Sequence, residues 1–315
     1  MILYRWRGET TNFGDELNTI LWPALLPDFF DDDPSTRFLG IGSILDRRHP
    51  AEARKLVAGA AYGGYEGKPV LDATWTVHWV RGPRTARALG LPASLGLGDP
   101  AVLMQHAIAI KSAATLGVGF MPHFESAARG AWQRAADIAG VTLIDPRARP
   151  LEILVQIVRC RVLLSEALHG IIVADALRVP WVAIRPLQPI NRPKWQDWAE
   201  TVNVVPRFAI LPPSAVAEWF SRLPVLASRL RRHAQRLPVG EPMIARAARA
   251  LAQAARAEPQ LSPEAALERC QSRMLDAVAQ LRRYPDAPPC RITPQGRRSC
   301  LRRADDSAYE PVPIG

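Results

Sequence analysis

Short apolar runs alternate with amphipathic stretches along the first 225 residues, and this alternation is the main structural signal in the chain. Where the apolar positions follow the 3.6-residue period, we predict helices at residues 16–25, with Asp15 as N-cap, and 83–89, which begins with a proline. Runs rich in β-branched and aromatic residues predict strands at 2–6, 36–41, 55–58 and 76–80. We therefore expect βα units with a parallel sheet covered by helices.

A second set of the same kind begins after residue 113. We predict strands at 117–121, 141–144, 161–164 and 181–184, and helices at 126–139, 150–158 and 170–177. A linker is expected around 105–111. The fold class is therefore α/β, with two Rossmann-like domains, residues 1–110 and 111–225, that face each other across a cleft. Ligands of such sheets bind at the carboxyl ends of the strands.

The last 90 residues have a different composition. Residues 226–315 hold 16 arginines against nine acidic residues, so they carry +7 of the total net charge of +10, and they contain none of the nine tryptophans. Helical periods at 226–237, 244–255 and 263–281 predict an Arg/Ala-rich helical extension over residues 226–284. Residues 285–315 are rich in proline and arginine, and we expect them to be disordered.

Several classes of protein are excluded by composition. No apolar run approaches the roughly 20 residues that a membrane-spanning helix needs. The first residues lack the apolar core of a signal peptide. The four cysteines form no C-x-x-C pair, which argues against a disulfide scaffold or a zinc site. No other metal-ligand spacing is present, so we expect no metal and no cofactor, in a cytoplasmic protein.

The segment around His169 is the sharpest candidate site. An apolar strand runs into Ser165-Glu166-Ala167-Leu168, and a helix begins at His169-Gly170. The first N–H groups of a helix carry partial positive charge and favour a phosphate or carboxylate. His169 would then be a titratable group beside a bound anion. The alternative, a histidine that merely packs at the strand–helix junction, stays open on position alone.

Further candidates occupy the same kind of position. Arg81 follows a strand directly, where its guanidinium can bind a carboxylate or phosphate through two N–H groups, although a salt bridge at the sheet edge is the alternative. The first βα loop offers Asn12, Gly14 and Asp15. The alternative for Asp15 is that it merely caps the helix that follows. Weaker candidates beside strand ends or turns are Asp99, His123 and Lys194.

Eight segments, taken in order, resemble the polysaccharide pyruvyl transferase family, and most closely its bacterial exopolysaccharide ketal-pyruvyltransferase branch. They are NFGDELN (12–18), GIGSIL (40–45), VAGAAYGGYEG (57–67), VRGPRTARALGLP (80–92), GDPAVL (98–103), GFMPHF (119–124), SEALHGIIVADALRVPWVAI (165–184) and KWQDW (194–198). The resemblance covers about residues 1–225. It implies a glycosyltransferase-B-like arrangement of the two domains.

The resemblance also implies transfer of pyruvate from phosphoenolpyruvate to a sugar as a cyclic ketal, with release of phosphate. His169 would be the acid/base, and Arg81 would hold the phosphate or carboxylate. Direct substrate contacts are expected from the loops that follow the strands. The residues concerned are Asn12, Gly14, Asp15, Gly42, Ser43, Asp99, His123, Ser165, Gly170 and Lys194.

One position departs from the resemblance. Some relatives have arginine where this chain has Ala167. Either another cation replaces it, for which Arg185 and Arg192 are candidates by spacing, or phosphoenolpyruvate binds in a different position. Two other functions stay open, namely a nucleotide-sugar glycosyltransferase of the same fold class and a catalytically inactive scaffold in polysaccharide assembly.

The expected acceptor is a lipid-linked oligosaccharide or polysaccharide. The basic stretch at residues 226–237 would then rest on the anionic inner face of the cytoplasmic membrane, although a merely solvated extension is the alternative. Nucleic acid is not an expected partner, because aromatic residues are not interleaved with the basic ones.

Overall fold

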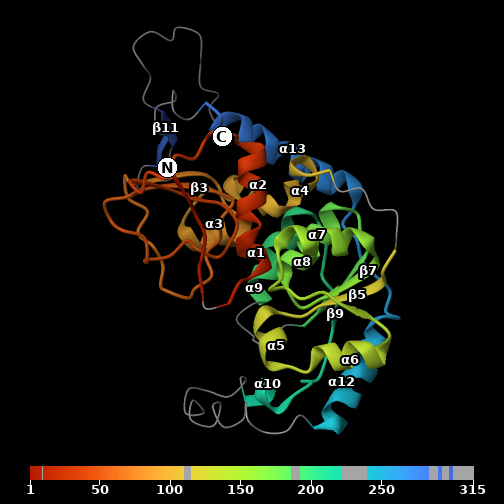
Figure 1. Cartoon of the computed structure of the whole chain (residues 1–315). Helices are drawn as coiled ribbons and strands as arrows, with labels where there is room; N and C mark the ends of the chain where they lie inside the picture. The colour runs from red at the N-terminus through yellow and green to blue at the C-terminus, as the bar shows by residue number, and fades with distance from the viewer. Residues whose placement is uncertain are drawn as a thin grey trace.

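Two parallel β-sheets, each flanked by helices, form the body of the protein (Figure 1). A computed structural model describes residues 1–8, 10–109, 115–185, 192–220, 240–283, 290–292 and 298–300. The predicted α/β class with parallel sheets is confirmed. The expected glycosyltransferase-B-like arrangement stays a prediction.

The first sheet has the strand order β1-β2-β3-β4, and all of its pairs are parallel. Its strands are β1 (Ile2–Tyr4), β2 (Thr36–Leu39), β3 (Arg54–Ala58) and β4 (Trp75–Trp79). The helical segments of this half are α1 (Phe13–Glu16), α2 (Asn18–Leu25), α3 (Pro83–Leu89), η1 (Ala93–Leu95), η2 (Pro100–Leu103) and α4 (Met104–Ala107). Helix α3 starts with a proline and ends at Gly90 in the left-handed conformation, as its sequence predicts.

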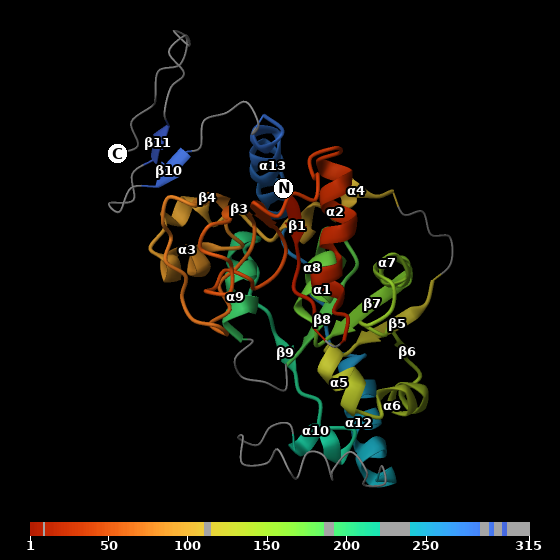
Figure 2. The same ribbon diagram turned by 60° about the vertical axis from the view of Figure 1, so that its left-hand side comes forward.

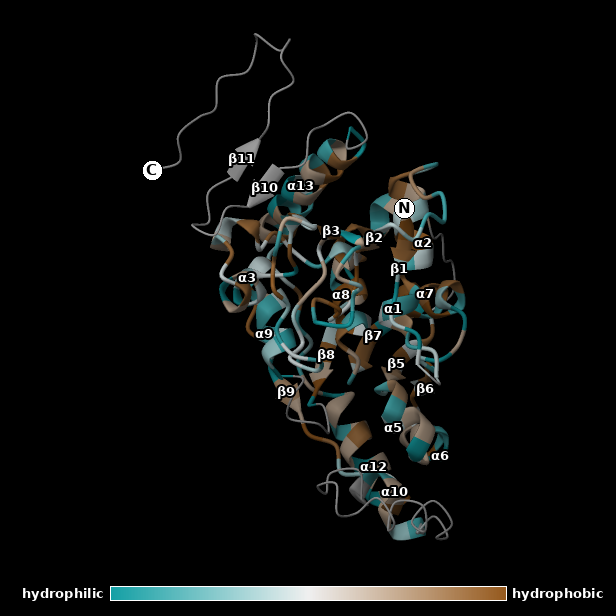
Figure 3. Ribbon diagram, turned by 90° about the vertical axis from the view of Figure 1, so that its left-hand side faces the viewer, coloured by the Kyte–Doolittle hydropathy of each residue, from teal (hydrophilic) through white to brown (hydrophobic). Residues whose placement is uncertain are grey.

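The second sheet has the order β6-β5-β7-β8-β9 and is also entirely parallel. Its strands are β5 (Gly117–Met121), β6 (Thr142–Leu143), β7 (Cys160–Ser165), β8 (Trp181–Ile184) and β9 (Phe208–Ala209). Its helices include α5 (Phe124–Arg129), α6 (Trp132–Ala139), α7 (Pro150–Arg159), α8 (Leu168–Ala176) and α10 (Val216–Phe220). Figure 3 shows the middle strands β5, β7 and β8 mostly in brown, as expected for strands covered on both faces.

One predicted helix is two helices. The apolar period at 126–139 predicts a continuous helix, but α5 ends at Arg129 and α6 starts at Trp132. At Gly130 the chain is extended, and a Cβ there would lie 2.5 Å from the Trp132 indole. The tight approach of the indole to this glycine accounts for the break.

The predicted domain boundary after residue 110 does not account for the packing of one later helix. Helix α9 (Arg192–Thr201) lies in sequence between β8 and β9 of the second sheet but packs against α3 of the first half. Its Trp195 and Trp198 are buried in the same core as Trp22 and Trp79. The chain therefore crosses back to the first half after β8, which no periodicity in residues 111–225 reveals.

The helices predicted at 244–255 and 263–281 are confirmed, but they pack on the rest of the protein rather than standing apart from it as an extension. Helix α12 (Glu241–Ala254) packs on α6 (Figure 2), and helix α13 (Glu264–Leu281) packs on η2, and the buried residues of each helix belong to a hydrophobic core of the protein. Between them, the Ser262 hydroxyl donates to the buried carboxylate of Asp175 at 2.6 Å. An Arg/Ala-rich helix packs in this way because its small apolar residues lie on one face and its arginines on the other.

The remaining predictions on the C-terminal region mostly lie outside the described residues. These include the stretch at 226–237 and nearly all of 285–315. Within the latter, β10 (Cys290–Ile292) and β11 (Arg298–Cys300) pair as a two-stranded antiparallel sheet. Across the described parts of the chain, none of the helices combines the length and apolar character needed to cross a membrane.

We predict that α12 contributes to the stability of the second half. Leu251 of α12 is 0% exposed, so Leu251→Ala should lower the free energy of unfolding by about 2–5 kcal/mol. Arg249→Ala, on the exposed face of the same helix, should change it by less than about 0.5 kcal/mol. Urea unfolding followed by circular dichroism measures both. Equal, negligible effects would show that α12 is an appendage after all.

Candidate functional site

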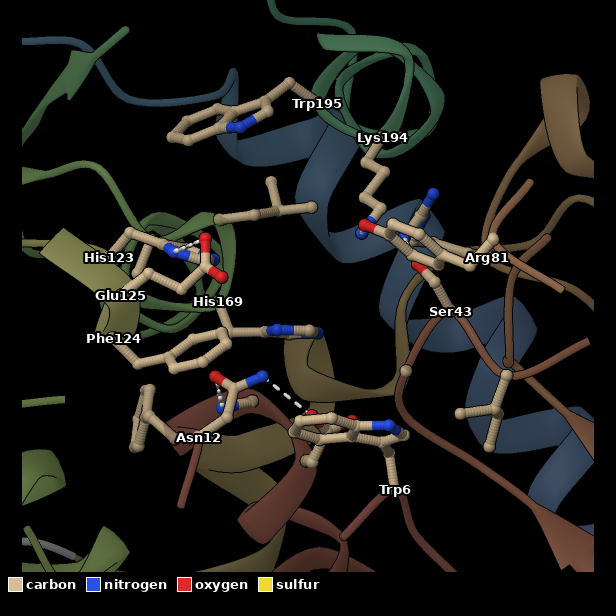
Figure 4. Close-up of a pocket in the computed structure, with 18 of the residues that line it drawn as sticks. Trp6, Asn12, Ser43, Arg81, His123, Phe124, Glu125, His169, Lys194 and Trp195 are labelled. Atoms are coloured by element: carbon tan, nitrogen blue, oxygen red, sulfur yellow. Dashed lines mark hydrogen bonds and ion pairs between the residues drawn. The ribbon is translucent and has the colours of Figure 1, made fainter. Parts of the chain in front are cut away.

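A cavity of about 360 Å³ lies where the carboxyl ends of the two sheets meet (Figure 4). Loops from both halves line it, and most of the lining residues follow a parallel strand, as the fold class predicts. The residues are Trp6, Asn12, Phe13, Gly14, Asp15, Gly42, Ser43, Ile44, Arg48, Tyr65, Glu66, Arg81, His123, Phe124, Glu125, Glu166, Ala167, Leu168, His169, Lys194 and Trp195. Most of the predicted site residues are thus brought together here.

His169 lies in the first turn of α8 and is held from two sides. Its Nε2 is 3.4 Å from Oδ2 of Asp99, which is 1% exposed. Burial opposes ionisation of Asp99, but His169, Arg81 and the Ala101 N–H together keep the pKa of Asp99 below its usual value. Asp99 does not line the cavity. Its predicted contact with substrate is therefore replaced by contact with the imidazole.

Gly14 lets the imidazole lie directly against the first loop. A Cβ at position 14 would fall 2.0 Å from Nδ1 of His169. Any side chain here would displace the ring. The role of Gly14 is therefore to make room for His169.

Arg81 is buried against a carboxylate from the other half of the sequence. Its Nε donates to Oδ2 of Asp197 at 3.1 Å, and its Nη1 lies 3.4 Å from the Ser43 hydroxyl. Asp197 belongs to α9 and also accepts from the Thr85 hydroxyl at 2.6 Å and from the Arg84 N–H at 2.9 Å. The salt bridge therefore orients the guanidinium, while Arg81 still lines the cavity.

Lys194 supplies a second cation to the cavity. Its Nζ lies 4.4 Å from the centroid of the Tyr65 ring and donates to the Tyr65 hydroxyl. Burial, and after it the positive charge of Arg81, lowers the pKa of Lys194 to about 7, and Asp15 opposes the shift. The two arginines that spacing indicated, Arg185 and Arg192, are exposed and do not line the cavity. Of these three residues, Lys194 is therefore the one placed to supply the positive charge that an arginine at position 167 supplies in some relatives.

Asp15 is buried beside the same cavity. Burial raises the pKa of its carboxyl to about 6, although His169, Asn12 and Lys194 oppose the shift. Its Oδ2 accepts from the Asn12 amide at 2.7 Å. A Cβ at Gly42, where φ is +129°, would lie 2.9 Å from Oδ1. Asp15 is not the helix cap that its position predicted, because Asn12 accepts from the Gly14 N–H at 3.4 Å and caps α1.

His123 lies on the opposite wall from Arg81 (Figure 4). Burial, together with the positive charges of Lys194 and Arg129, lowers its pKa to about 4, so the ring is neutral at pH 7. The backbone N–H of His123 donates to Oε2 of Glu166 at 2.9 Å. Glu166 thus ties the loop after β5 to the loop after β7.

Two predicted contact residues lie behind the wall of the cavity. The Ser165 hydroxyl accepts from the Ala167 N–H at 3.0 Å and donates to the Ala167 carbonyl at 2.9 Å, so it shapes the turn before α8. A Cβ at Gly170 would lie 2.6 Å from that hydroxyl. Ser165 and Gly170 do not line the cavity, unlike most of the other predicted contact residues.

Sequence reasoning missed the aromatic part of the cavity. Trp6, Tyr65 and Phe124 line it but were not singled out, although Tyr65 and Phe124 belong to the segments at 57–67 and 119–124. The available signal was position, since Trp6 follows β1 and Phe124 follows β5. Within the described residues, no cluster of three or more His, Cys, Asp or Glu side chains is arranged to hold a metal ion.

Comparison with known proteins identifies the family. The sequence profile of the family described as "Polysaccharide pyruvyl transferase" matches residues 65–187. The succinoglycan biosynthesis protein ExoV of Rhizobium meliloti (strain 1021) is 35% identical over 311 residues, which cover 89% of this chain and 98% of that protein. The chain belongs to the polysaccharide pyruvyl transferase family. The predicted family is thereby confirmed.

The polysaccharide pyruvyl transferase profile spans part of the cavity wall. Residues 65–187 include Arg81, Asp99, His123 and His169, whereas Lys194 lies beyond the match. Family membership indicates a transferase that acts in polysaccharide pyruvylation. No solved structure matches the chain.

The raised pKa of Asp15 predicts a pH-dependent cost in stability. The folded protein holds this proton up to about pH 6, whereas a fully solvated aspartate, whose pKa is 3.8, releases it earlier. Ionised Asp15 therefore destabilises the fold above about pH 6, and this cost disappears as the pH falls towards 3.8.

Asp15→Asn should accordingly raise the free energy of unfolding at pH 7 by up to about 3 kcal/mol, and by less as the pH is lowered towards 4. Denaturant titrations at several pH values measure this, with the exposed Glu52→Gln as a control that should show no such trend. A loss of stability at pH 7 would contradict the burial cost.

Proposed function

We propose that the protein transfers pyruvate from phosphoenolpyruvate to two hydroxyls of one hexose in an exopolysaccharide repeat unit, forming a cyclic ketal and releasing phosphate. The observation that carries this proposal is the convergence in one cavity of two basic side chains with an imidazole that a buried carboxylate contacts from behind the cavity wall. Arg81 and Lys194 provide the basic side chains, His169 the imidazole and Asp99 the carboxylate.

The cations suit the donor. Phosphoenolpyruvate carries a phosphate and a carboxylate, which need charged N–H donors and favour a helix N-terminus. Arg81, oriented by Asp197, and Lys194 lie together on one side of the cavity with Ser43 (Figure 4). The α8 N-terminus, at Ala167 and Leu168, reaches the same cavity. We assign the donor to this side.

The reaction requires three proton movements. A proton adds to the methylene carbon of phosphoenolpyruvate, which becomes the methyl group and leaves an electrophilic C2. The first sugar hydroxyl loses its proton as its oxygen bonds to C2. The second hydroxyl then forms the other C2–O bond, its proton is lost, and the C2–O bond to phosphate breaks.

Histidine is suited to exchange these protons near neutral pH. Asp99 faces Nε2 of His169, and Nδ1 lies over Gly14 at the cavity wall. We therefore propose His169 as the acid/base and Asp99 as the residue that orients it. Asp15, with its pKa of about 6, is ionised at pH 7 and can accept a hydrogen bond from a sugar hydroxyl.

The name of the relative supports the class of acceptor. ExoV of Rhizobium meliloti is named for succinoglycan biosynthesis. We propose that the acceptor of the present protein is likewise an exopolysaccharide unit, carried on a lipid at the inner face of the membrane.

We predict that His169→Ala lowers kcat by about 10²–10⁴-fold, the usual contribution of a general acid/base. Phosphate release and the new ketal methyl signal in the NMR spectrum measure the reaction of phosphoenolpyruvate with de-pyruvylated exopolysaccharide oligosaccharides. Undiminished turnover by His169→Ala would refute the assignment. Binding of a sugar nucleotide but not of phosphoenolpyruvate by the wild type would favour a glycosyltransferase.

We predict that Arg81→Gln raises KM for phosphoenolpyruvate by about 10–150-fold, which corresponds to one charged hydrogen bond of about 1.5–3 kcal/mol. Arg84→Gln is the matched control, because Arg84 lies three residues after Arg81, in the first turn of α3, but pairs with Glu200 outside the cavity. Equal effects of the two changes would contradict a donor site at Arg81.

Membrane contact is tested on the full chain, since truncation at residue 225 would remove the two core helices α12 and α13. The triple change Arg229→Gln, Arg231→Gln and Arg232→Gln should reduce co-sedimentation with anionic liposomes, since each basic residue near such a surface contributes about 1 kcal/mol. Unchanged co-sedimentation would remove the membrane role of residues 226–237.

A further inference from the structure

Two aromatic rings from different halves of the protein meet at one wall of the cavity. Trp6 follows β1 of the first sheet, and Phe124 is the first residue of α5, directly after β5 of the second. Their ring centroids are 6.4 Å apart and their planes are tilted by 49°. Both side chains are only partly buried, and both line the cavity. The pair therefore forms an open, angled apolar surface rather than part of a closed core.

Both rings are held in place by their neighbours. The six-membered ring of Trp6 lies so close to Gly8 that a Cβ there would meet it at 2.0 Å. The Phe124 ring packs against His123 with centroids 4.5 Å apart. A ligand that contacts this surface therefore does not have to order it first, which reduces the entropic cost of binding.

The cavity has room beyond the donor. Its volume of about 360 Å³ lies within the range of pockets that bury drug-sized ligands, and a three-carbon acid occupies only part of it. Arg81, Ser43 and Lys194 lie on one side in Figure 4, Trp6, Asn12 and Phe124 on another, and His169 between them in this view. The aromatic side is thus the part of the cavity left for the second substrate.

We propose that Trp6 and Phe124 form the platform on which a pyranose ring of the acceptor glycan lies, with Asn12 and Glu125 beside it as partners for its hydroxyls. This inference rests on the proposed function and adds to it the acceptor subsite.

The chemistry of a pyranose matches this surface. One face of the sugar ring presents C–H groups, which pack on the negative face of an aromatic ring, while the hydroxyls project at the edge. The tilt and separation of the two rings leave no slot between them, so the sugar lies across both. Donor binding here is disfavoured, because the carboxylate of Glu125 would repel an anion.

The polar groups at the edge are positioned for hydroxyls. Nη2 of Arg129 lies 3.5 Å from Oε1 of Glu125 and orients that carboxylate. The side chain of Asn12 is tied to Asp15 at 2.7 Å. A carboxylate accepts hydrogen bonds and an amide both donates and accepts, so together they can bind neighbouring hydroxyls of one hexose. A sugar held here presents its other hydroxyls towards His169.

The kinetic test separates the two substrates. Trp6→Ala and Phe124→Ala should each raise KM for the acceptor oligosaccharide by at least about tenfold, which corresponds to about 1.4 kcal/mol. KM for phosphoenolpyruvate should stay within about twofold. Trp6→Phe, which keeps an aromatic face, should recover most of the loss, whereas Trp6→Leu should not.

Phe30→Leu serves as the matched control, because Phe30 is a partly buried aromatic outside the cavity. It should leave both KM values unchanged. The proposal is overturned if the Trp6 and Phe124 variants keep the wild-type KM for the acceptor, or if KM for phosphoenolpyruvate rises as much as that for the acceptor. Circular dichroism of each variant detects misfolding.

A binding measurement keeps this test distinct from that of the proposed function. Saturation-transfer NMR with methyl hexopyranosides, without phosphoenolpyruvate, should show the sugar C–H protons in contact with wild-type protein and a reduced signal with Trp6→Ala. If the wild type binds these sugars but transfers no pyruvate, the proposed reaction fails and the subsite stands. If it transfers pyruvate while Trp6→Ala and Phe124→Ala bind sugar normally, the subsite fails and the reaction stands.

Discussion

The carboxylate of Asp197 holds together the parts from which the cavity is built. It is 1% exposed, and a buried charge is tolerated only when it is paired and fully hydrogen-bonded. Arg81, the Thr85 hydroxyl and two backbone N–H groups at the start of α3 satisfy it. Because Asp197 lies on α9, between β8 and β9 of the second sheet, this one group joins that segment to a strand end of the first sheet.

The same contact decides where the cations lie. Lys194 is on α9, three residues before Asp197, so the helix that orients Arg81 also carries the second cation. At Gly82 a Cβ would lie 2.1 Å from the Asp197 carbonyl oxygen, which shows how closely α9 approaches α3. Burial, and after it the positive charge of Arg81, then lowers the pKa of Lys194 to about 7. The basic side chains of Arg81 and Lys194, whose burial costs free energy, are thus placed where they can bind an anion.

Much of the fold could be predicted from the chain. The strand at 117–121, the helix at 83–89 and the strand at 181–184 have the predicted limits, because apolar period, proline and glycine all indicate the same structure there. The predictions of secondary structure and domain organisation failed where tertiary packing, rather than the local sequence pattern, decided the structure. The helix predicted at 126–139 is interrupted at Gly130 because the Trp132 indole packs there. Helix α12 was predicted to belong to a separate extension because its packing partner, α6, is distant in sequence.

For the site, position after a strand was enough to select His169, Arg81, Asn12 and Lys194, because parallel strands bring their carboxyl ends to one edge. Residue type and spacing could not tell that Asp99 faces an imidazole or that Ser165 lies behind the wall. These outcomes depend on contacts between segments far apart in the chain.

By itself the sequence determined the α/β class, the family and most of the polar residues of the cavity, since these follow from local period and short motifs. Only the tertiary structure decided that α9 returns to the first half, that Lys194 rather than Arg185 or Arg192 reaches the cavity, and that Trp6 meets Phe124. The reason is physical: burial and pairing of charges are set by the packing of distant segments, which no local pattern encodes.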